Sequence, residues 1–75
     1  MSAEHDFRGL RCPLPVLRAR RVLKGMEAGA EAIFLLDDPK ARADFGEFCR
    51  LSGWRIVDDK DDINGGGYSL HLKLD

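Results

Sequence analysis

A cysteine followed by two prolines, in the segment 11–15 (RCPLP), is the part of the chain best suited to chemistry. Proline is tolerated at the start of a helix because the first N–H groups of a helix have no partner inside it. We therefore predict a helix that begins at Pro13, with Cys12 as its N-cap. The positive end of the helix dipole, with Arg8 and Arg11 nearby, would then favour the nucleophilic thiolate form of Cys12. The alternative is that Cys12 serves only as a small cap residue.

The length and composition of the chain limit where such chemistry can take place. Its 75 residues make a single domain, 1–75, with a small core, so we expect a solvent-facing site rather than a large internal pocket. The polar start (MSAEHD) lacks the apolar core of a signal peptide, and no apolar stretch approaches the length of a membrane span. We expect a cytoplasmic protein without membrane insertion, in which Cys12 and Cys49 form no structural disulfide.

Charge is distributed unevenly along the sequence. Residues 1–24 carry a net charge of +4, whereas residues 25–75 carry −5. The positive half contains Cys12, so its field could steer an acidic partner protein towards the thiol. The acidic remainder makes binding to nucleic acid unfavourable.

Several other chemistries lack the residues that they need. The two histidines, His5 and His71, do not form a familiar zinc spacing with the two cysteines, and we expect no metal and no bound cofactor. The glycines 65–67 precede a strand rather than a helix, so they predict a turn and not a phosphate loop. A protease-like pair would need a histidine close to Cys12 and a substrate cleft, which so small a chain hardly offers. An exposed cysteine without such helpers suits a reaction in which partner proteins supply the remaining machinery.

The first half of the sequence predicts strand, helix, strand. Residues 5–10 alternate weakly and predict a short strand that Gly9 ends. From Pro13, apolar residues recur at helical spacing as far as Met26, and Gly25 marks the end of the helix. Residues 30–36 form a nearly continuous apolar run, which predicts a strand buried on much of both faces.

The second half predicts helix, strand, strand. Asp38 caps a helix that runs to Ser52 and stops at Gly53, with Cys49 pointing inward as an inert, buried thiol. A strand follows at 54–57, and we interpret the acidic run 58–62 as a solvated loop rather than a metal site. The segment 64–67 (NGGG) predicts a chain reversal. The last strand alternates strictly and should bury these residues while it pairs with the preceding strand: Tyr68, Leu70, Leu72 and Leu74.

The order strand, helix, strand, helix, strand, strand defines the fold class. Right-handed crossovers place both helices on one face of the sheet and leave the other face more open. We predict an α+β fold, a two-layer α/β sandwich with a four-stranded mixed sheet.

These residues resemble the TusA/SirA family of small sulfur-carrier proteins. The likeness covers nearly the whole chain and is carried by the segment 7–17 with its Cys-Pro-x-Pro motif, by Gly29, by Asp38-Pro39 and by Phe48-Cys49. It implies a β-α-β-α-β-β fold similar to the C-terminal domain of bacterial translation initiation factor three. It also implies that Cys12 accepts sulfane sulfur as a persulfide from a donor of the cysteine desulfurase or rhodanese type and passes it to an acceptor protein.

The resemblance also implies roles for other residues of this chain. Pro13 and Pro15 would fix the cap at the start of the helix, and Gly9 would permit a close approach of the backbone. The candidates for docking partner proteins are basic: Arg11, Arg18, Arg20 and Arg21.

Two positions differ from the family pattern. Leu14 stands where members that serve tRNA thiolation have glutamate, and Trp54 stands where histidine is common, which argues against the tRNA pathway. Sulfur oxidation, thiosulfate use, selenium metabolism and molybdenum-cofactor supply stay open as pathways. Two alternatives from other classes also stay open: a non-enzymatic protein-interaction or regulatory module, and a redox-sensing cysteine protein.

Overall fold

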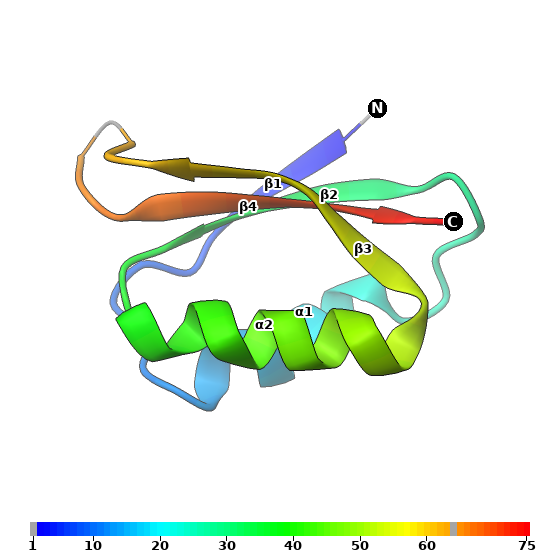
Figure 1. Ribbon diagram of the computed structural model, residues 1–75, viewed down its shortest axis with the longest axis horizontal. Coiled ribbons are helices and arrows are strands. Elements are labelled where there is room, and N and C mark those ends of the chain that lie inside the picture. Colours follow the sequence, from blue (N-terminus) through cyan, green and yellow to red (C-terminus); the bar gives the residue numbers. More distant parts are fainter. Residues whose placement is uncertain (1, 64) are drawn as a thin grey trace.

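The structure, a computed structural model, describes residues 2–63 and 65–75. Its elements are β1 (Ser2–Asp6), α1 (Leu14–Leu23), β2 (Glu31–Leu36), α2 (Pro39–Ser52), β3 (Trp54–Asp61) and β4 (Tyr68–Leu74). The sheet has the order β1-β2-β4-β3, with β1 parallel to β2 and β4 antiparallel to both of its neighbours. Both helices cover the same face of the sheet (Figure 1), so the predicted two-layer α+β fold is confirmed.

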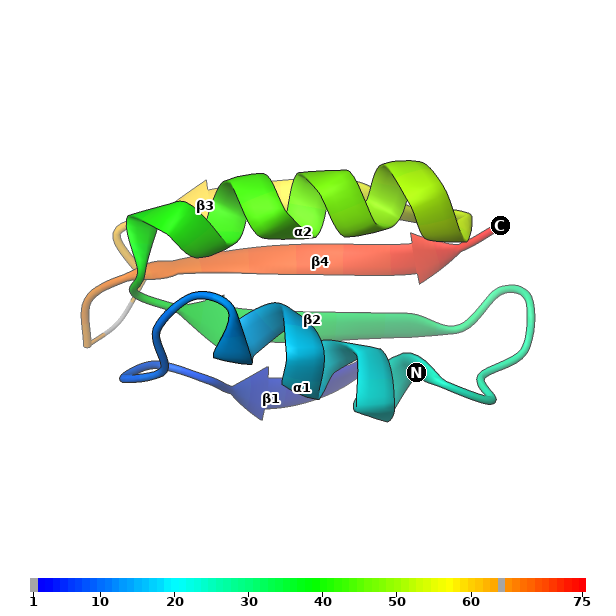
Figure 2. The same cartoon turned by 90° about the horizontal axis from the view of Figure 1, so that it is seen from below.

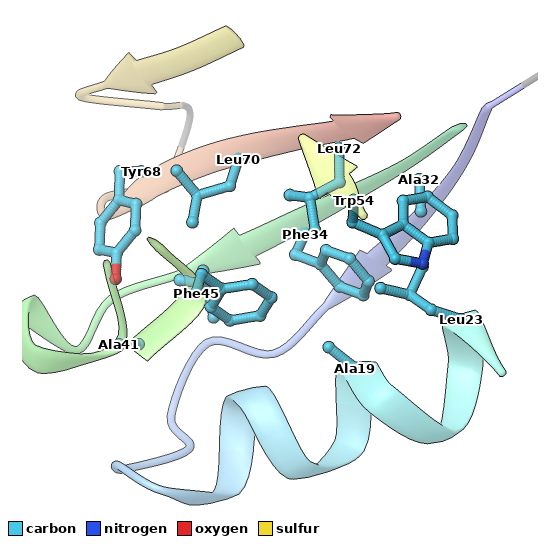
Figure 3. Packing of buried hydrophobic residues seen from close by; sticks show 11 residues of the cluster. Ala19, Leu23, Ala32, Phe34, Ala41, Phe45, Trp54, Tyr68, Leu70 and Leu72 are labelled. Carbon is cyan, nitrogen blue, oxygen red and sulfur yellow. The ribbon is translucent and has the colours of Figure 1, made fainter. Parts of the chain in front are cut away.

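The core lies between the sheet and the helices. Figure 3 shows its buried side chains, which come from five of the six elements: Ala19, Leu23, Ala32, Phe34, Leu36, Ala41, Phe45, Trp54, Tyr68, Leu70 and Leu72. The rings of Phe34 and Phe45 join β2 to α2, with their centroids 5.4 Å apart. Burial along β2 alternates, because α1 and α2 both lie on one face of the sheet (Figure 1). The prediction of a strand buried on much of both faces is therefore confirmed fully for one face only, since Ile33 and Leu35 on the other face are half-buried.

The first strand lies earlier than predicted, at 2–6 instead of 5–10. Its register against β2 runs from Ser2 opposite Glu31 to Asp6 opposite Leu35. Beyond it the Asp6 carboxylate accepts a hydrogen bond from the Arg8 amide, which turns the chain. Gly9 follows at φ +91°, a conformation that glycine adopts without strain. A Cβ atom at this position would meet no other atom within 4 Å, so the expected close approach of the backbone at Gly9 was wrong, and the positive φ is the reason for glycine. Pairing with β2 and this turn decide the position of the strand, and the weak alternation of 5–10 does not.

The predicted cap residues give the boundaries of α2 but not the start of α1. The Asp38 side chain accepts a hydrogen bond from the Lys40 amide at the start of α2, and Gly53 ends α2 at φ +89°, as predicted. In α1 the N-cap is Pro13 and the helix begins at Leu14, so the prediction of Cys12 as N-cap was wrong. The helix also stops before Met26, which packs against the core from the following loop.

The acidic segment 58–62, predicted as a loop, is mostly strand. After a bulge between Ile56 and Asp58, β3 stays paired with β4 as far as Asp61. The reason comes from α2, where Arg42 forms ion pairs with Asp59 at 2.9 Å and Asp61 at 2.6 Å and offsets their repulsion. Within the described part of the chain, no cluster of histidine, cysteine and carboxylate side chains could hold a metal ion.

The hairpin between β3 and β4 forms where the glycines predicted it. Gly65, Gly66 and Gly67 all have φ near +90°, and the amide of Gly66 donates to the Ile63 carbonyl at 2.8 Å. Asn64, which belongs to the predicted turn, lies outside the described residues. β4 buries Tyr68, Leu70 and Leu72 as predicted, with Leu74 partly buried.

The topology brings the two helix starts together. Since β1 and β2 are parallel and each is followed by a helix, α1 and α2 begin at the same end of the sheet, as Figure 2 shows. Loops at the carboxyl ends of parallel strands are a common location for functional residues. None of the helices in residues 2–63 and 65–75 combines the length and apolar character needed to cross a membrane.

Candidate functional site

Cys12 lies in the loop between β1 and α1, one residue before the N-cap, and it is exposed to solvent. Pro13 and Pro15 carry no N–H group, and the amide of Leu14 donates to the Arg11 carbonyl at 2.8 Å. Two of the donors that the first turn of α1 would otherwise offer, those of residues 14 and 15, are thus used or missing. Cys12 is accessible as predicted, whereas fewer helix amides are left to stabilise a thiolate than the sequence predicted.

Two adjacent carboxylates hold the loop 7–13, the Cys12 loop, in place. Asp37 accepts hydrogen bonds from the Gly9 amide at 2.9 Å and from the Arg11 guanidinium at 3.0 Å. Buried Asp38 accepts one from the Cys12 amide at 2.6 Å while it also caps α2. These hydrogen bonds lower the pKa of both carboxyl groups, most of all through the Gly9 amide for Asp37 and the Cys12 amide for Asp38. The loop is therefore fixed to the start of α2.

The Cys12 sulfur faces a third carboxylate. Its thiol donates a hydrogen bond to the Oδ2 atom of Asp44, which lies on α2. This bond raises the pKa of Cys12, and desolvation and the negative charges of Asp44 and Asp38 raise it further, against a small lowering by Lys40. The predicted low pKa of Cys12 was therefore wrong, because the hydrogen bond to Asp44 favours the thiol form over the thiolate.

A shallow groove between α1 and α2 opens beside the sulfur. Its volume is about 430 Å³, and its lining is mixed: Cys12, Pro13, Val16, Arg20, Asp44, Glu47, Phe48, Leu51 and Ser52. A second hollow of about 550 Å³ shares Arg20, Phe48 and Ser52 with it and adds Arg21. The Leu51 side chain at the groove is 70% exposed. Apolar side chains beside charged ones at a groove rim are typical of a surface that binds another protein.

The arginines proposed for docking do not lie together. Arg20 borders both hollows and Arg21 borders the second, whereas Arg18 lines neither. Arg11 is engaged by Asp37 within the Cys12 loop.

Sequence reasoning gave Asp38 a capping role only and missed Asp44 altogether. The predicted topology offered a signal for Asp44. Because the two helices start side by side, the second turn of α2, which contains Asp44, lies next to Cys12 just before α1.

Cys49 is the second free cysteine and differs from Cys12 in its surroundings. It is half-buried and packs against the core beside Phe48. Burial raises the pKa of its thiol to about 11. The prediction of a buried Cys49 is thus confirmed only in part, since the residue is half-buried, and its inertness stays a prediction.

The fold and the site together define a class of protein: a small two-layer α+β domain that presents one accessible thiol just before its first helix, beside a groove suited to a protein partner. Known proteins with similar sequences identify the family within this class.

Residues 3–74 match the model of the family described as "Sulfurtransferase TusA". The chain therefore belongs to the TusA family, and this membership supports a role in carrying sulfur. It is 34% identical over 70 residues to the sulfur carrier protein TusA of Allochromatium vinosum, which covers 93% of this chain and 90% of that relative. It is 43% identical over 53 residues to a protein of Neisseria meningitidis serogroup A named "Putative sulfur carrier protein", covering 71% of this chain and 72% of that relative. A serogroup B relative with the same name matches equally well.

Proposed function

We propose that Cys12 accepts sulfane sulfur as a persulfide from a donor protein and delivers it to an acceptor protein. The observation that carries the proposal is an exposed thiol on a loop fixed by Asp37 and Asp38, at the mouth of a groove. Family membership supports the sulfur-carrier role. The donor is of the cysteine desulfurase or rhodanese type, since both carry sulfur on a cysteine.

The chemistry needs no external oxidant or reductant. The Cys12 thiolate attacks the terminal sulfur of the donor persulfide, so that a new S–S bond forms while the S–S bond of the donor breaks. The donor cysteine leaves as a thiolate and takes up a proton. In delivery, the acceptor thiolate attacks the terminal sulfur on Cys12 in the same way, and the protein returns to its thiol form.

Incubation with a donor system and measurement of intact mass test this function. With rhodanese and thiosulfate, or with a cysteine desulfurase and cysteine, we expect a mass gain of one sulfur atom, which dithiothreitol removes. A protein that gains no sulfur from either system would contradict the proposal and favour an interaction or regulatory module.

The redox-sensor alternative is tested with peroxide. A sensor cysteine reacts as a low-pKa thiolate, whereas the pKa of Cys12 is raised. We therefore expect Cys12 to form oxygen adducts no faster than an ordinary thiol. Faster oxidation than that of a free cysteine would favour the sensor function.

We also propose that the groove between α1 and α2 receives the partner and that Arg20 contributes most among the arginines, because it borders both hollows. Arg20→Glu should lower kcat/KM for sulfur loading on the order of tenfold, as removal of an interfacial arginine and reversal of its charge weaken docking. Initial loading rates at low donor concentration measure this effect.

The matched control is Arg18→Glu, which makes the same charge change on the same helix away from both hollows. It should stay within about twofold of the wild type. Equal losses in the two variants would mean that overall charge, and not contact at the groove, governs docking.

A further inference from the structure

Asp44 contacts the reacting sulfur, and no salt bridge to its carboxylate is found in the part of the chain that the structure describes. It accepts the thiol hydrogen bond of Cys12. Glu47, one turn further along α2, is paired with Arg50, whereas no lysine or arginine in residues 2–63 and 65–75 forms an ion pair with Asp44. A half-buried carboxylate at the rim of a groove, without a cationic partner, is a place where a positive side chain of another protein would bind favourably.

The charges around the sulfur come from every element packed near it. They are Arg11 from its own loop, Arg20 from α1, Asp38 from the start of α2, and Lys40, Asp44 and Glu47 from α2. Of these, Arg11 is occupied by Asp37 and Glu47 by Arg50. The negative charges of Asp44 and Asp38 outweigh Lys40, so the free protein holds a neutral thiol. Oxidants and stray electrophiles attack thiolates, and this arrangement limits such attack on an exposed cysteine.

We propose that Asp44 keeps the free protein in its unreactive thiol form, and that a cationic side chain of the sulfur donor pairs with Asp44 on docking and so releases the thiolate. The inference rests on the proposed function, because it assumes that a donor protein docks beside Cys12. It adds the chemistry of the partner: a lysine or arginine close to the sulfur-bearing cysteine of the donor.

The release step is balanced in protons and electrons. When the donor cation pairs with Asp44, the carboxylate no longer holds the thiol proton, which passes to solvent. The Cys12 thiolate then forms an S–S bond with the terminal sulfur of the donor, and the S–S bond of the donor breaks. The leaving thiolate of the donor takes a proton from solvent, so the exchange involves no net oxidation.

The first test measures how far Asp44 suppresses ionisation of the Cys12 thiol. The rate of alkylation of Cys12 by iodoacetamide is followed by intact mass between about pH 6 and pH 10, a range that spans the ordinary thiol pKa. Asp44→Asn removes the charge and should speed alkylation at neutral pH by about threefold to tenfold, with the two curves converging where both thiols are ionised. The pH midpoint of the rate should fall.

Two further variants support this measurement. Glu27→Gln removes one negative charge from the loop beyond the other end of α1 and should leave the curve unchanged. Asp44→Ser removes the same carboxylate with a different side chain and should show the same faster alkylation. It replaces Asp44→Asn in the test if circular dichroism shows that Asp44→Asn folds poorly. An Asp44 variant that is folded and has the alkylation curve of the wild type would overturn the inference.

The second test asks whether a donor cation releases the Cys12 thiolate, or whether Asp44 only slows the reaction of Cys12 with every sulfur source. Sulfur loading is compared between inorganic polysulfide, which brings no protein cation, and rhodanese with thiosulfate. In Asp44→Asn, polysulfide loading should become faster, while the ratio of rhodanese-driven to polysulfide-driven rates should fall on the order of tenfold, because the donor cation has lost its partner. An unchanged ratio would overturn the release step. A wild-type protein that accepts sulfur from neither source would instead overturn the proposed function, independently of the alkylation curves.

Discussion

Replacing Cys12 by serine should abolish sulfur loading completely. The serine hydroxyl is nearly the same size, so the loop and its hydrogen bond between the residue-12 amide and Asp38 should persist. A hydroxyl is hardly ionised at neutral pH and cannot form a persulfide, so no sulfur can be carried. Intact mass after incubation with rhodanese and thiosulfate should show no gain, and thermal unfolding should show a Tm close to that of the wild type.

Cys49→Ser is the matched control for this prediction. The same chemical change is made at a half-buried thiol that packs against the core. We expect full loading with one sulfur atom, together with a loss of stability of about 1 kcal/mol from placing a hydroxyl in apolar surroundings. Loading that persists in Cys12→Ser, or that disappears in a folded Cys49→Ser protein, would show that the assignment of the reaction to Cys12 is wrong.

The parts of the fold that sequence predicts well are those whose signals are local. Asp38 before Pro39 marks the start of α2, Gly53 marks its end, and the alternation from Tyr68 to Leu74 identifies β4. The fold class follows from the order of such elements. By contrast, the extension of β3 into an acidic run depends on Arg42, which reaches it from another element. Local sequence cannot contain that information.

The same distinction applies to the site. The exposed position of Cys12 follows from its place between a strand and a proline-rich helix start. Its ionisation does not, because the dominant neighbour, Asp44, is 32 residues away and reaches the thiol only when α1 and α2 pack against one sheet face. The dipole argument favoured a thiolate by less than about one pKa unit, a small effect that one close carboxylate reverses.

Asp38→Ala should produce the largest loss of stability among substitutions at the site. Its carboxylate caps α2 through the Lys40 amide and accepts from the Cys12 amide, so alanine leaves two N–H groups without these partners. In a domain of this size each 1 kcal/mol moves Tm by about 4–8 °C, and we expect a decrease on the order of 10 °C. Loading should also slow, because the Cys12 loop loses its attachment to α2.

Comparison with the adjacent carboxylate makes this prediction specific. Asp37→Ala removes hydrogen bonds from Gly9 and Arg11 at a more exposed position and should lower Tm by only a few degrees. Asp38→Asn keeps one acceptor oxygen and should fall between the wild type and Asp38→Ala. An equal decrease for Asp37→Ala and Asp38→Ala would contradict the role assigned to the buried carboxylate.

The pH dependence of stability provides an independent test of the same carboxylates. Their pKa values are lowered in the folded protein, so the stability that they contribute is fully present above the ordinary value of 3.8 and is lost as the pH falls through the lower folded values. Asp6, whose pKa falls to about 2 beside Arg8, extends this acid range further. Thermal unfolding of the wild type should therefore show a Tm that is nearly constant above the ordinary carboxyl pKa and decreases below it. In Asp38→Asn the decrease should be smaller, because the group that takes up a proton on unfolding has been removed; a decrease as steep as that of the wild type would show that Asp38 does not hold the Cys12 loop as a carboxylate.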